Sequence, residues 1–254
     1  MRGHRRHRRR RERTQVAQPK GASTTMSIVL VTGTGTDIGK TVGTAALAAA
    51  LREEGKEVHV VKPIQTGFPG PNGGDLDTVA ELTGIDNLHG FERYPEPMAP
   101  VAAAQRAGMR LPEAMEIAEK IKLIDGPNRV VLVEGAGGLL VRLGEDWALP
   151  ELAGLLPGSQ MVVVTRLDLG CLNEAELTVE VARGRGVNVT ALVGGSLPAE
   201  VDPIIETNLE ELPRITGVPL LGSVQAGAGR LDRQEFVAKA TQWLPGVREW
   251  AAAL

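Results

Sequence analysis

A glycine-rich loop between an apolar run and an alanine-rich run constrains this chain more than any other feature. Residues 28–32 predict a buried strand, residues 33–41 read GTGTDIGKT, and residues 40–54 predict a helix. Backbone N–H groups in such a loop, reinforced by the helix dipole, form a cradle for a di- or triphosphate. Lys40 can reach the outer phosphates, and the Thr41 hydroxyl can ligate Mg²⁺. The sequence therefore predicts a nucleotide site after the first strand.

The spacing of this loop departs from the strict pattern GxxxxGK[ST], because five residues rather than four separate Gly33 from Gly39. An ordinary glycine-rich turn between a strand and a helix is the alternative interpretation. The order of strand, loop, GKT and helix favours the phosphate site.

The body of the chain alternates short Val-, Ile- and Leu-rich runs with helical stretches. This alternation predicts a single doubly wound α/β domain over residues 26–254, with a mostly parallel sheet and a P-loop NTPase-type topology. Strands are expected at 28–32, 58–61, 130–133, 161–165, 189–193 and 220–224, and helices at 40–54, 75–82, 112–124, 173–183, 204–211 and 232–243. In such sheets ligands collect beyond the carboxyl ends of the strands, so the residues there are the candidates for chemistry.

The formal net charge of −3 averages two unlike parts of the chain. Residues 1–25 contain eight arginines and Lys20 against a single acid, Glu12, whereas the remaining residues contain 19 basic and 30 acidic side chains. The acidic body argues against a nucleic-acid-binding face, since phosphate backbones are bound through clustered Lys and Arg. A functionless disordered tail, or a start codon assigned too early with Met26 as the true beginning, is favoured for residues 1–25. A basic arm for RNA or acidic lipid and an organelle transit segment are the alternatives.

The single cysteine, Cys171, excludes a disulfide scaffold and a cysteine-based zinc cluster, and it suits the reducing cytoplasm. The longest apolar runs, such as residues 42–51, fall well short of the ~20 residues that a bilayer span requires. We therefore expect a cytoplasmic protein without a membrane partner.

A lysine follows the second expected strand. Lys62 opens the segment KPIQTG, and at a carboxyl end of the sheet it would face the same crevice as Lys40. The alternative is a solvated lysine before the turn-forming Pro63.

Carboxylates stand at two further positions near the expected strand ends. Glu134 ends the apolar run VVLV, where a carboxylate needs a cation, and a Mg²⁺ shared with Thr41 would serve. A helix-capping or structural glutamate is the alternative. Asp75 and Asp77 stand at the start of the next expected helix, and either could simply cap it.

Six segments of the chain, taken together, resemble the dethiobiotin synthetase family in order and spacing. They are VTGTGTDIGKT, VKPIQTG, GGDLDTVAEL, RYPEPMAPVAAA, VVLVEGAGGLLV and LGCLNEAELT, and the resemblance runs from about residue 26 to residue 240. It implies a homodimer that uses ATP and Mg²⁺ to join CO₂ to 7,8-diaminononanoate. An amine takes up CO₂ as a carbamate, the carbamate attacks the γ-phosphate of ATP, and the second amine closes the ureido ring.

The resemblance also implies roles for individual residues. Lys62 and Lys40 would be the catalytic lysines, and Thr41, Asp75 and Glu134 the Mg²⁺ ligands. The nucleotide would be bound by Asp37, Ile38, Gly39, Lys40, Thr41, Val42, Asp75, Glu134, Gly135, Ala136 and Gly137. The substrate would be bound by Thr66 and, across the dimer, by the amides of Gly170 and Cys171 and the side chain of Asn173. The Cys171 thiol itself would only fill space.

The chain departs from the family at Gly195-Ser196, where many members place Asn-Asp to contact the adenine edge. Because glycine offers no side-chain amide, the resemblance implies that CTP or GTP competes with ATP. The main alternative function is a partition- or septum-type P-loop switch ATPase that acts through protein partners. Such proteins usually carry a further lysine early in the loop, and residues 34–38 read TGTDI instead. Two weaker alternatives are a corrinoid amidotransferase, which would need a glutaminase domain, and a nucleotide-binding domain without catalysis.

Overall fold

The computed structural model describes residues 27–67, 70 and 73–254. The interpretation of residues 1–25 lies outside the described residues and stays a prediction. In the described part of the chain, no helix is both long and apolar enough to cross a membrane.

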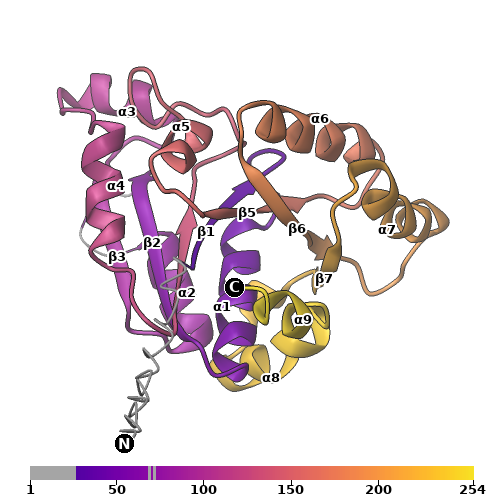
Figure 1. The fold of residues 1–254 in the computed structure, drawn as a ribbon. Coiled ribbons are helices and arrows are strands. Elements are labelled where there is room, and N and C mark those ends of the chain that lie inside the picture. The colour runs from indigo at the N-terminus through magenta and orange to yellow at the C-terminus, as the bar shows by residue number, and fades with distance from the viewer. Residues whose placement is uncertain (1–26, 68–69, 71–72) are drawn as a thin grey trace, which may run out of the picture.

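Within the described residues, seven parallel strands form one sheet in the order β3-β2-β4-β1-β5-β6-β7 (Figure 1). The strands are β1 (Ile28–Gly33), β2 (Glu57–Thr66), β3 (Leu88–Tyr94), β4 (Arg129–Glu134), β5 (Gln160–Thr165), β6 (Asn188–Leu197) and β7 (Leu220–Gln225). The first strand lies in the interior of the sheet, between β4 and β5, so its carboxyl end opens near the ends of both neighbours. This arrangement confirms the predicted doubly wound α/β fold.

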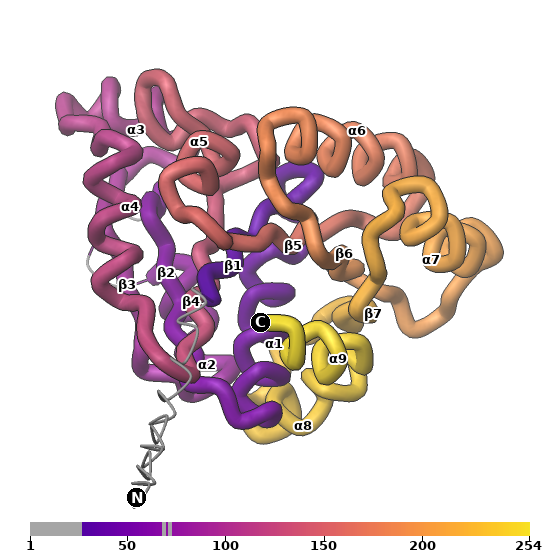
Figure 2. Tube along the Cα trace, viewed as in Figure 1, coloured from indigo at the N-terminus to yellow at the C-terminus, as the bar shows by residue number. Residues whose placement is uncertain are grey.

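Helices cover both faces of the sheet. One face carries α1 (Lys40–Glu53), α2 (Asp75–Thr83), α8 (Arg233–Trp243) and α9 (Val247–Ala251), with the short η1 (Ala228–Arg230) after β7. The other face carries α3 (Pro100–Ala107), α4 (Ala114–Lys122), α5 (Leu149–Gly154), α6 (Cys171–Gly184) and α7 (Pro203–Thr216). The two layers are visible in Figure 1, and the tube in Figure 2 brings α9, at the end of the chain, beside α1.

The apolar runs of the sequence form the two cores because side chains alternate along a strand. In β1, Ile28 and Leu30 pack under the α4–α7 layer, while Val29 and Val31 pack under α1. Both faces are covered by helices, so residues 28–31 are apolar at every position rather than at every second one.

The structure adds one strand and three helices that the sequence pattern did not predict, namely β3, α3, α5 and α9. The missed strand reads LHGFERY, and it lies at the edge of the sheet with β2 as its neighbour. Six of its seven residues are half-buried or exposed, so it lacks the continuous apolar run of the interior strands. The missed helices contain only five to eight residues each, too short for a clear helical period.

The second strand is longer than the expected 58–61, because β3 continues the pairing through Thr66. Lys62 therefore lies inside β2 and not after it. The ladder between β2 and β4 ends at Val61, so Pro63 sits where no bond to β4 is lost. The strand expected at 189–193 likewise extends to Leu197 as β6.

Several helix boundaries also differ from those expected. The helix expected at 112–124 is the shorter α4, because Leu111, Pro112 and Glu113 precede it in non-helical conformations. The helices expected at 173–183 and 204–211 begin earlier and end later, as α6 and α7. Helix α7 continues past Pro213, which lies in its last turn.

Candidate active site

The loop between β1 and α1 packs backbone against backbone on β6. Gly39 precedes α1 with a φ of +88°, in the left-handed region that favours glycine. A Cβ atom at this position would lie 2.6 Å from the carbonyl oxygen of Gly195. The close contact holds the loop under the N-terminus of α1, where backbone N–H groups point away from the helix. The predicted phosphate cradle is therefore present as a strand–loop–helix unit.

Lys40, the first residue of α1, is folded back along this loop. Its side chain is largely buried, and Nζ lies 3.4 Å from the carbonyl oxygen of Gly35, to which it donates a hydrogen bond. Burial lowers the pKa of Lys40, although the neighbouring Glu134 counteracts this effect. The ammonium group is thus poorly solvated, and a bound phosphate would be a stronger partner than a neutral carbonyl.

Lys62 lies at the centre of a buried polar cluster. Its side chain is 4% exposed, and Nζ donates hydrogen bonds to Oε1 of Glu134 at 2.9 Å and to the carbonyl oxygen of Gly135 at 2.8 Å. The same ammonium group forms an ion pair with the Asp75 carboxylate. A solvated lysine before a turn is therefore excluded for Lys62.

The cluster joins side chains from four elements. Thr41 of α1 donates a hydrogen bond from Oγ1 to Oε1 of Glu134, which ends β4, at a distance of 2.9 Å. Asp75 begins α2, and Lys62 comes from β2. The Glu134 oxygen therefore accepts from both Thr41 and Lys62, although these residues are far apart in the sequence.

The charges in the cluster stabilise one another. Burial acts to lower the pKa of Lys62, but the carboxylates of Glu134 and Asp75 outweigh it and raise that pKa. Burial acts to raise the pKa of Asp75, but Lys62 outweighs it, and the pKa of Asp75 falls. At neutral pH the cluster therefore holds an ammonium group against ionised carboxylate, as paired buried charges require.

A cavity of about 440 Å³ opens beside this cluster. It is lined by most of the residues expected to bind the nucleotide, the metal and the substrate, namely Asp37, Gly39, Lys40, Thr41, Val42, Lys62, Thr66, Asp75, Glu134, Ala136 and Gly137. Two of the residues expected to bind the nucleotide do not line it. Ile38 is buried beneath the loop, and Gly135 is buried at the end of β4.

Three lining residues escaped the sequence analysis: Thr36, Ile64 and Gln65. Gln65 belongs to the segment KPIQTG that was singled out for Lys62, but nothing in the spacing indicates that its side chain reaches across to α2. Ile64 gave no pattern that separates it from an ordinary core residue.

A second cavity of about 540 Å³ adjoins the first and shares Thr36, Asp37, Thr66, Ala136 and Gly137 with it. Its remaining wall is mostly apolar, with Pro97, Met98 and Pro100 on one side and Val141 on the other. Together the two cavities offer a polar end at the phosphate loop and an apolar end beside α3.

The residues expected to bind substrate at the start of α6 do not line either cavity. Gly170 precedes α6 with a φ of +98° and is exposed, as is Asn173. Cys171 is fully buried in the core, and its amide N–H donates to the carbonyl oxygen of Asp168 at 3.1 Å. The Cys171 thiol packs in the core, as a residue that only fills space would, and burial raises its pKa. In the single chain the Cys171 amide is already engaged by Asp168, and its expected role in binding substrate across a dimer stays a prediction.

The pair Gly195-Ser196 lies within β6 and not after it, which corrects the boundary used in the sequence analysis. Ser196 is exposed. A Cβ atom on Gly195 would lie 1.8 Å from the carbonyl oxygen of Ile38 in the phosphate loop. The glycine is therefore required by the close approach of loop and strand, in addition to any effect on the nucleotide.

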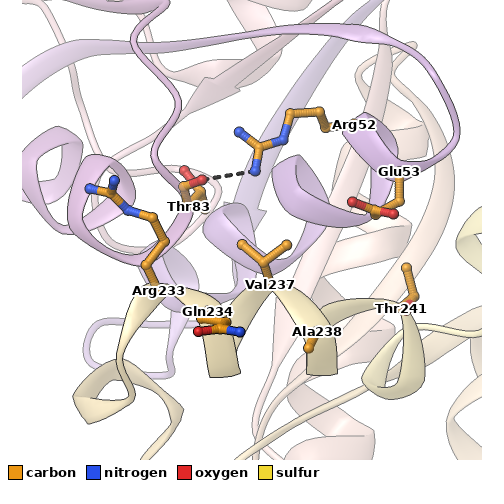
Figure 3. A pocket seen from close by; sticks show the side chains of 8 residues that line it. All are labelled: Arg52, Glu53, Thr83, Arg233, Gln234, Val237, Ala238 and Thr241. Atoms are coloured by element: carbon orange, nitrogen blue, oxygen red, sulfur yellow. Dashed lines mark hydrogen bonds between the residues drawn. The ribbon is translucent and has the colours of Figure 1, made fainter.

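A separate cavity of about 500 Å³ lies at the far end of α1 from the phosphate loop (Figure 3). Arg52 donates to the carbonyl oxygen of Thr83 at 2.9 Å, which is the dashed line in Figure 3. Arg233 of α8 donates to the carbonyl oxygens of Ala80 and Glu81. These guanidinium groups donate to backbone carbonyls in the last turns of α2, so the arginines of this cavity serve the fold.

The phosphate-loop cavity offers the donor set that Mg²⁺ prefers. Thr41, Asp75 and Glu134 contribute one hydroxyl and two carboxylates, and Mg²⁺ usually combines one or two carboxylates with phosphate oxygens and water. Among the described residues, no three His, Cys, Asp or Glu side chains come together as a metal site. One hydroxyl and two carboxylates fit a Mg²⁺ that is also bound by nucleotide phosphates.

The fold and the phosphate loop define a P-loop nucleotide-binding protein. Solved structures of similar fold include a ParA family ATPase from Chlorobium tepidum, with a TM-score of 0.54 and 15% identity over 91% of this chain and 99% of that one. The septum site-determining protein MinD from Pyrococcus horikoshii, complexed with Mg-ADP, has a TM-score of 0.54 and 19% identity over 88% and 94% of the two chains. At these identities the likeness concerns the fold alone.

Sequence comparison is more specific. A family model described as "AAA domain" matches residues 27–228. The ATP-dependent dethiobiotin synthetase BioD of Corynebacterium kroppenstedtii is 53% identical over 215 residues, which cover 85% of this chain and 93% of that protein. The protein of the same name from Streptomyces coelicolor is 44% identical over 220 residues, covering 86% and 92%. The chain belongs to the family of ATP-dependent dethiobiotin synthetases.

Proposed function

We propose that the two adjoining cavities are where this chain performs its family's ATP-dependent synthesis of dethiobiotin, by carboxylation and ring closure of 7,8-diaminononanoate with CO₂. The observation that carries this assignment is Lys62, a buried ammonium group between Asp75 and Glu134 in the wall of the phosphate-loop cavity. The apolar cavity beside α3 suits the aliphatic part of such a diamine.

The proposed reaction proceeds in three steps. One amine of the substrate attacks CO₂ and loses a proton, which gives a carbamate. A carbamate oxygen then attacks the γ-phosphorus of ATP, the bond from that phosphorus to the bridging oxygen breaks, and ADP leaves. The second amine attacks the carbon of the resulting carbamic-phosphoric anhydride, the carbon–oxygen bond to phosphate breaks, and a proton is lost as the ureido ring closes.

The residues act mainly by positioning and by neutralising charge, since phosphoryl transfer leaves little covalent work for the protein. Backbone N–H groups of residues 37–42 hold the phosphates, and Lys40 turns from the Gly35 carbonyl to the transferred group. Lys62 faces the carbamate and offsets the charge of this weak anionic nucleophile. Asp75 and Glu134 keep Lys62 protonated and in place.

We propose Thr41, Asp75 and Glu134 as the residues that hold Mg²⁺. When bound, the ion supplies further neutralisation of the phosphate charge. The protein's part is to bring one hydroxyl and two carboxylates to the same side of the phosphate loop.

We propose that the chain acts as a cytoplasmic homodimer. Leu140, Leu169 and Leu177 expose large apolar side chains, and a groove of about 530 Å³ runs between the phosphate loop and α6. Gly170 and Asn173 lie outside the cavities of their own chain, so a second copy is needed to bring them to a substrate. In that arrangement the Gly170 amide and the Asn173 side chain would bind the substrate carboxylate.

Release of phosphate from ATP, dependent on 7,8-diaminononanoate and bicarbonate, tests the function. We expect the diamine to stimulate release in the wild type and the Lys62→Ala variant to abolish the stimulation. Release that is indifferent to the diamine would overturn the assignment. An unchanged rate in Lys62→Ala would overturn the role of Lys62 alone.

A further inference from the structure

The start of α2 is capped by a residue outside the helix. The position before the helix is Gly74, which has no side chain to accept from the unpaired N–H groups of the first turn. The amide N–H of Asp75 donates instead to Oε1 of Gln65 on β2, at 2.9 Å. The side-chain amide of Gln65 in turn donates from Nε2 to the carbonyl oxygen of Thr66 at 3.1 Å. Both ends of the Gln65 amide are therefore engaged.

The contact is close because position 74 is glycine. Gly74 has a φ of +117°, and a Cβ atom there would lie 2.8 Å from Oε1 of Gln65. Gln65 is 8% exposed and lines the phosphate-loop cavity, so its side chain has little freedom to move elsewhere. The segment therefore places glycine where the glutamine must approach the backbone.

We infer that Gln65 is a positioning residue, which fixes the start of α2 so that the Asp75 carboxylate stays against Lys62. This inference rests on the proposed function of the site. Asp75 is the first residue of α2, so the position of its carboxylate depends on where the helix begins. Gln65 holds this residue by accepting a hydrogen bond from its backbone N–H. Lys62 and Gln65 come from the same strand, three residues apart, so β2 carries both the ammonium group and the anchor of its carboxylate partner.

Among the described residues, other contacts hold the connection between β2 and α2 at positions before Asp75. Arg93 donates to the carbonyl oxygens of Gly70 and Gly73, each at 2.8 Å. The amide of Gly67 donates to the carbonyl oxygens of Tyr94 and Glu96. These contacts anchor the connection to β3 and the segment after it, and Gln65 provides the bond to Asp75 itself.

Gln65→Met is the central variant, since methionine keeps the volume of the side chain and lacks the amide. A misplacement of about 1 Å can cost about 100-fold in rate, so we expect kcat to fall about 10- to 100-fold while KM for ATP changes little. Gln65→Glu retains an acceptor oxygen for the Asp75 N–H and is expected to recover most of kcat. The matched control is Gln242→Met on the exposed surface of α8, which should behave as the wild type.

A double-mutant cycle separates positioning through Asp75 from a general effect on the fold. In an Asp75→Asn background the carboxylate is already gone, so Gln65→Met should lower kcat by less than about twofold further, within the additivity error of such cycles. Multiplicative losses, with the full Gln65→Met effect retained in that background, would overturn the inference.

Amide hydrogen exchange of the protein without nucleotide gives a readout that does not depend on turnover. In the wild type, we expect the bond to Gln65 to protect the Asp75 N–H from exchange. In Gln65→Met that amide should exchange faster, while Thr78, whose N–H donates to the Gly74 carbonyl, keeps its protection. Unchanged protection at Asp75 would overturn the inference, even if Gln65→Met reduced activity.

The two proposals fail in different ways. If the wild type shows no diamine-stimulated phosphate release, the proposed function is wrong. If the wild type is active and Gln65→Met matches it in kcat and in exchange at Asp75, only the role of Gln65 is wrong.

Discussion

Oε1 of Glu134, at the end of β4, accepts hydrogen bonds from Lys62 Nζ and from Thr41 Oγ1, each at 2.9 Å. Glu134 and Lys62 are 72 positions apart in the sequence and come from neighbouring parallel strands. The shared oxygen ties the phosphate loop, through Thr41, to the lysine that we propose faces the carbamate. A change at any of these residues should therefore alter both stability and chemistry.

The first prediction separates the effect of these residues on stability from their effect on catalysis. Lys62→Met leaves the Asp75 and Glu134 carboxylates without their cation, and breaking a buried pair typically costs about 3–5 kcal/mol of the free energy of unfolding. Adding Glu134→Gln removes one of the stranded charges, so the double variant should regain part of that loss. Urea unfolding followed by circular dichroism measures the stability.

Activity should not recover when the added Glu134→Gln substitution restores part of the stability. We expect both variants to lose diamine-dependent phosphate release by at least ~100-fold, because neither carries the ammonium group. A double variant that regained activity together with stability would contradict the role of Lys62.

The second prediction concerns pH. The pKa of Asp75 is lowered from its ordinary value of 3.8 in the folded protein, so its ion pair contributes stability above about pH 4, and this is lost as pH falls through the lower folded value. The pKa of Lys62 is raised above 10.5, so its contribution is present below that pH and is lost as pH rises through the raised value. Between these limits the titration of Asp75 and Lys62 adds no slope to the stability profile.

The Asp75→Asn variant supplies the comparison for this profile. It should be less stable than the wild type at neutral pH, and the difference should shrink as the pH falls below about 4. Chemical unfolding at a series of pH values measures the difference. A constant difference from pH 2 to pH 7 would contradict the assigned shift in the Asp75 pKa.

The third prediction tests the contact between the phosphate loop and β6. Gly195→Ala places a methyl group 1.8 Å from the Ile38 carbonyl oxygen, so the loop must move. Overpacking of this kind typically costs about 1–3 kcal/mol, and a displaced loop should bind ATP more weakly. Isothermal titration calorimetry measures the affinity.

Gly184→Ala is the matched control for Gly195→Ala. Gly184 ends α6, and a Cβ atom there meets nothing within 4 Å. Alanine should be tolerated or slightly stabilising, with ATP affinity unchanged. Equal affinities for the two variants would show that the loop does not depend on the glycine at position 195.

The fourth prediction concerns nucleotide choice. Gly195 offers no side-chain amide to a base, and Ser196 is exposed, so we expect discrimination among bases to be weak. The kcat/KM values for CTP and GTP should lie within ~100-fold of the value for ATP, since larger ratios require buried polar groups that pair with one base only. A preference for ATP above that range over every other triphosphate would reject the prediction.

Much of the fold could be predicted from periodicity. The interior strands contain continuous apolar runs because helices cover both faces, and such runs identified these five strands and the edge strand β7. The edge strand β3 escaped because its six half-buried or exposed residues mix polar with apolar side chains. Since β3 extends the pairing of β2, its absence also placed Lys62 after the strand instead of inside it.

The residues of the candidate site also fall into those that the sequence predicted and those that it did not. The order of strand, loop and helix in the sequence was enough to predict the phosphate loop, Thr41 at the start of α1 and Glu134 at the end of β4. Gln65 was missed because its partner, the Asp75 amide, lies ten positions away and is reached across a turn. The substrate residues at the start of α6 were placed by resemblance, and the described chain alone does not bring them to the cavities.

The sequence by itself determined the class of fold, the family and the identity of the charged residues, because these depend on local patterns and on motifs in a fixed order. Only the tertiary structure decided which side chains contact one another in the site. Whether Lys62 is solvated or buried, and which carboxylates face it, depends on the parallel register that sets β2 beside β4 and on the packing of α2 over that edge. Those distances arise from contacts among segments far apart in the chain, which no local pattern specifies.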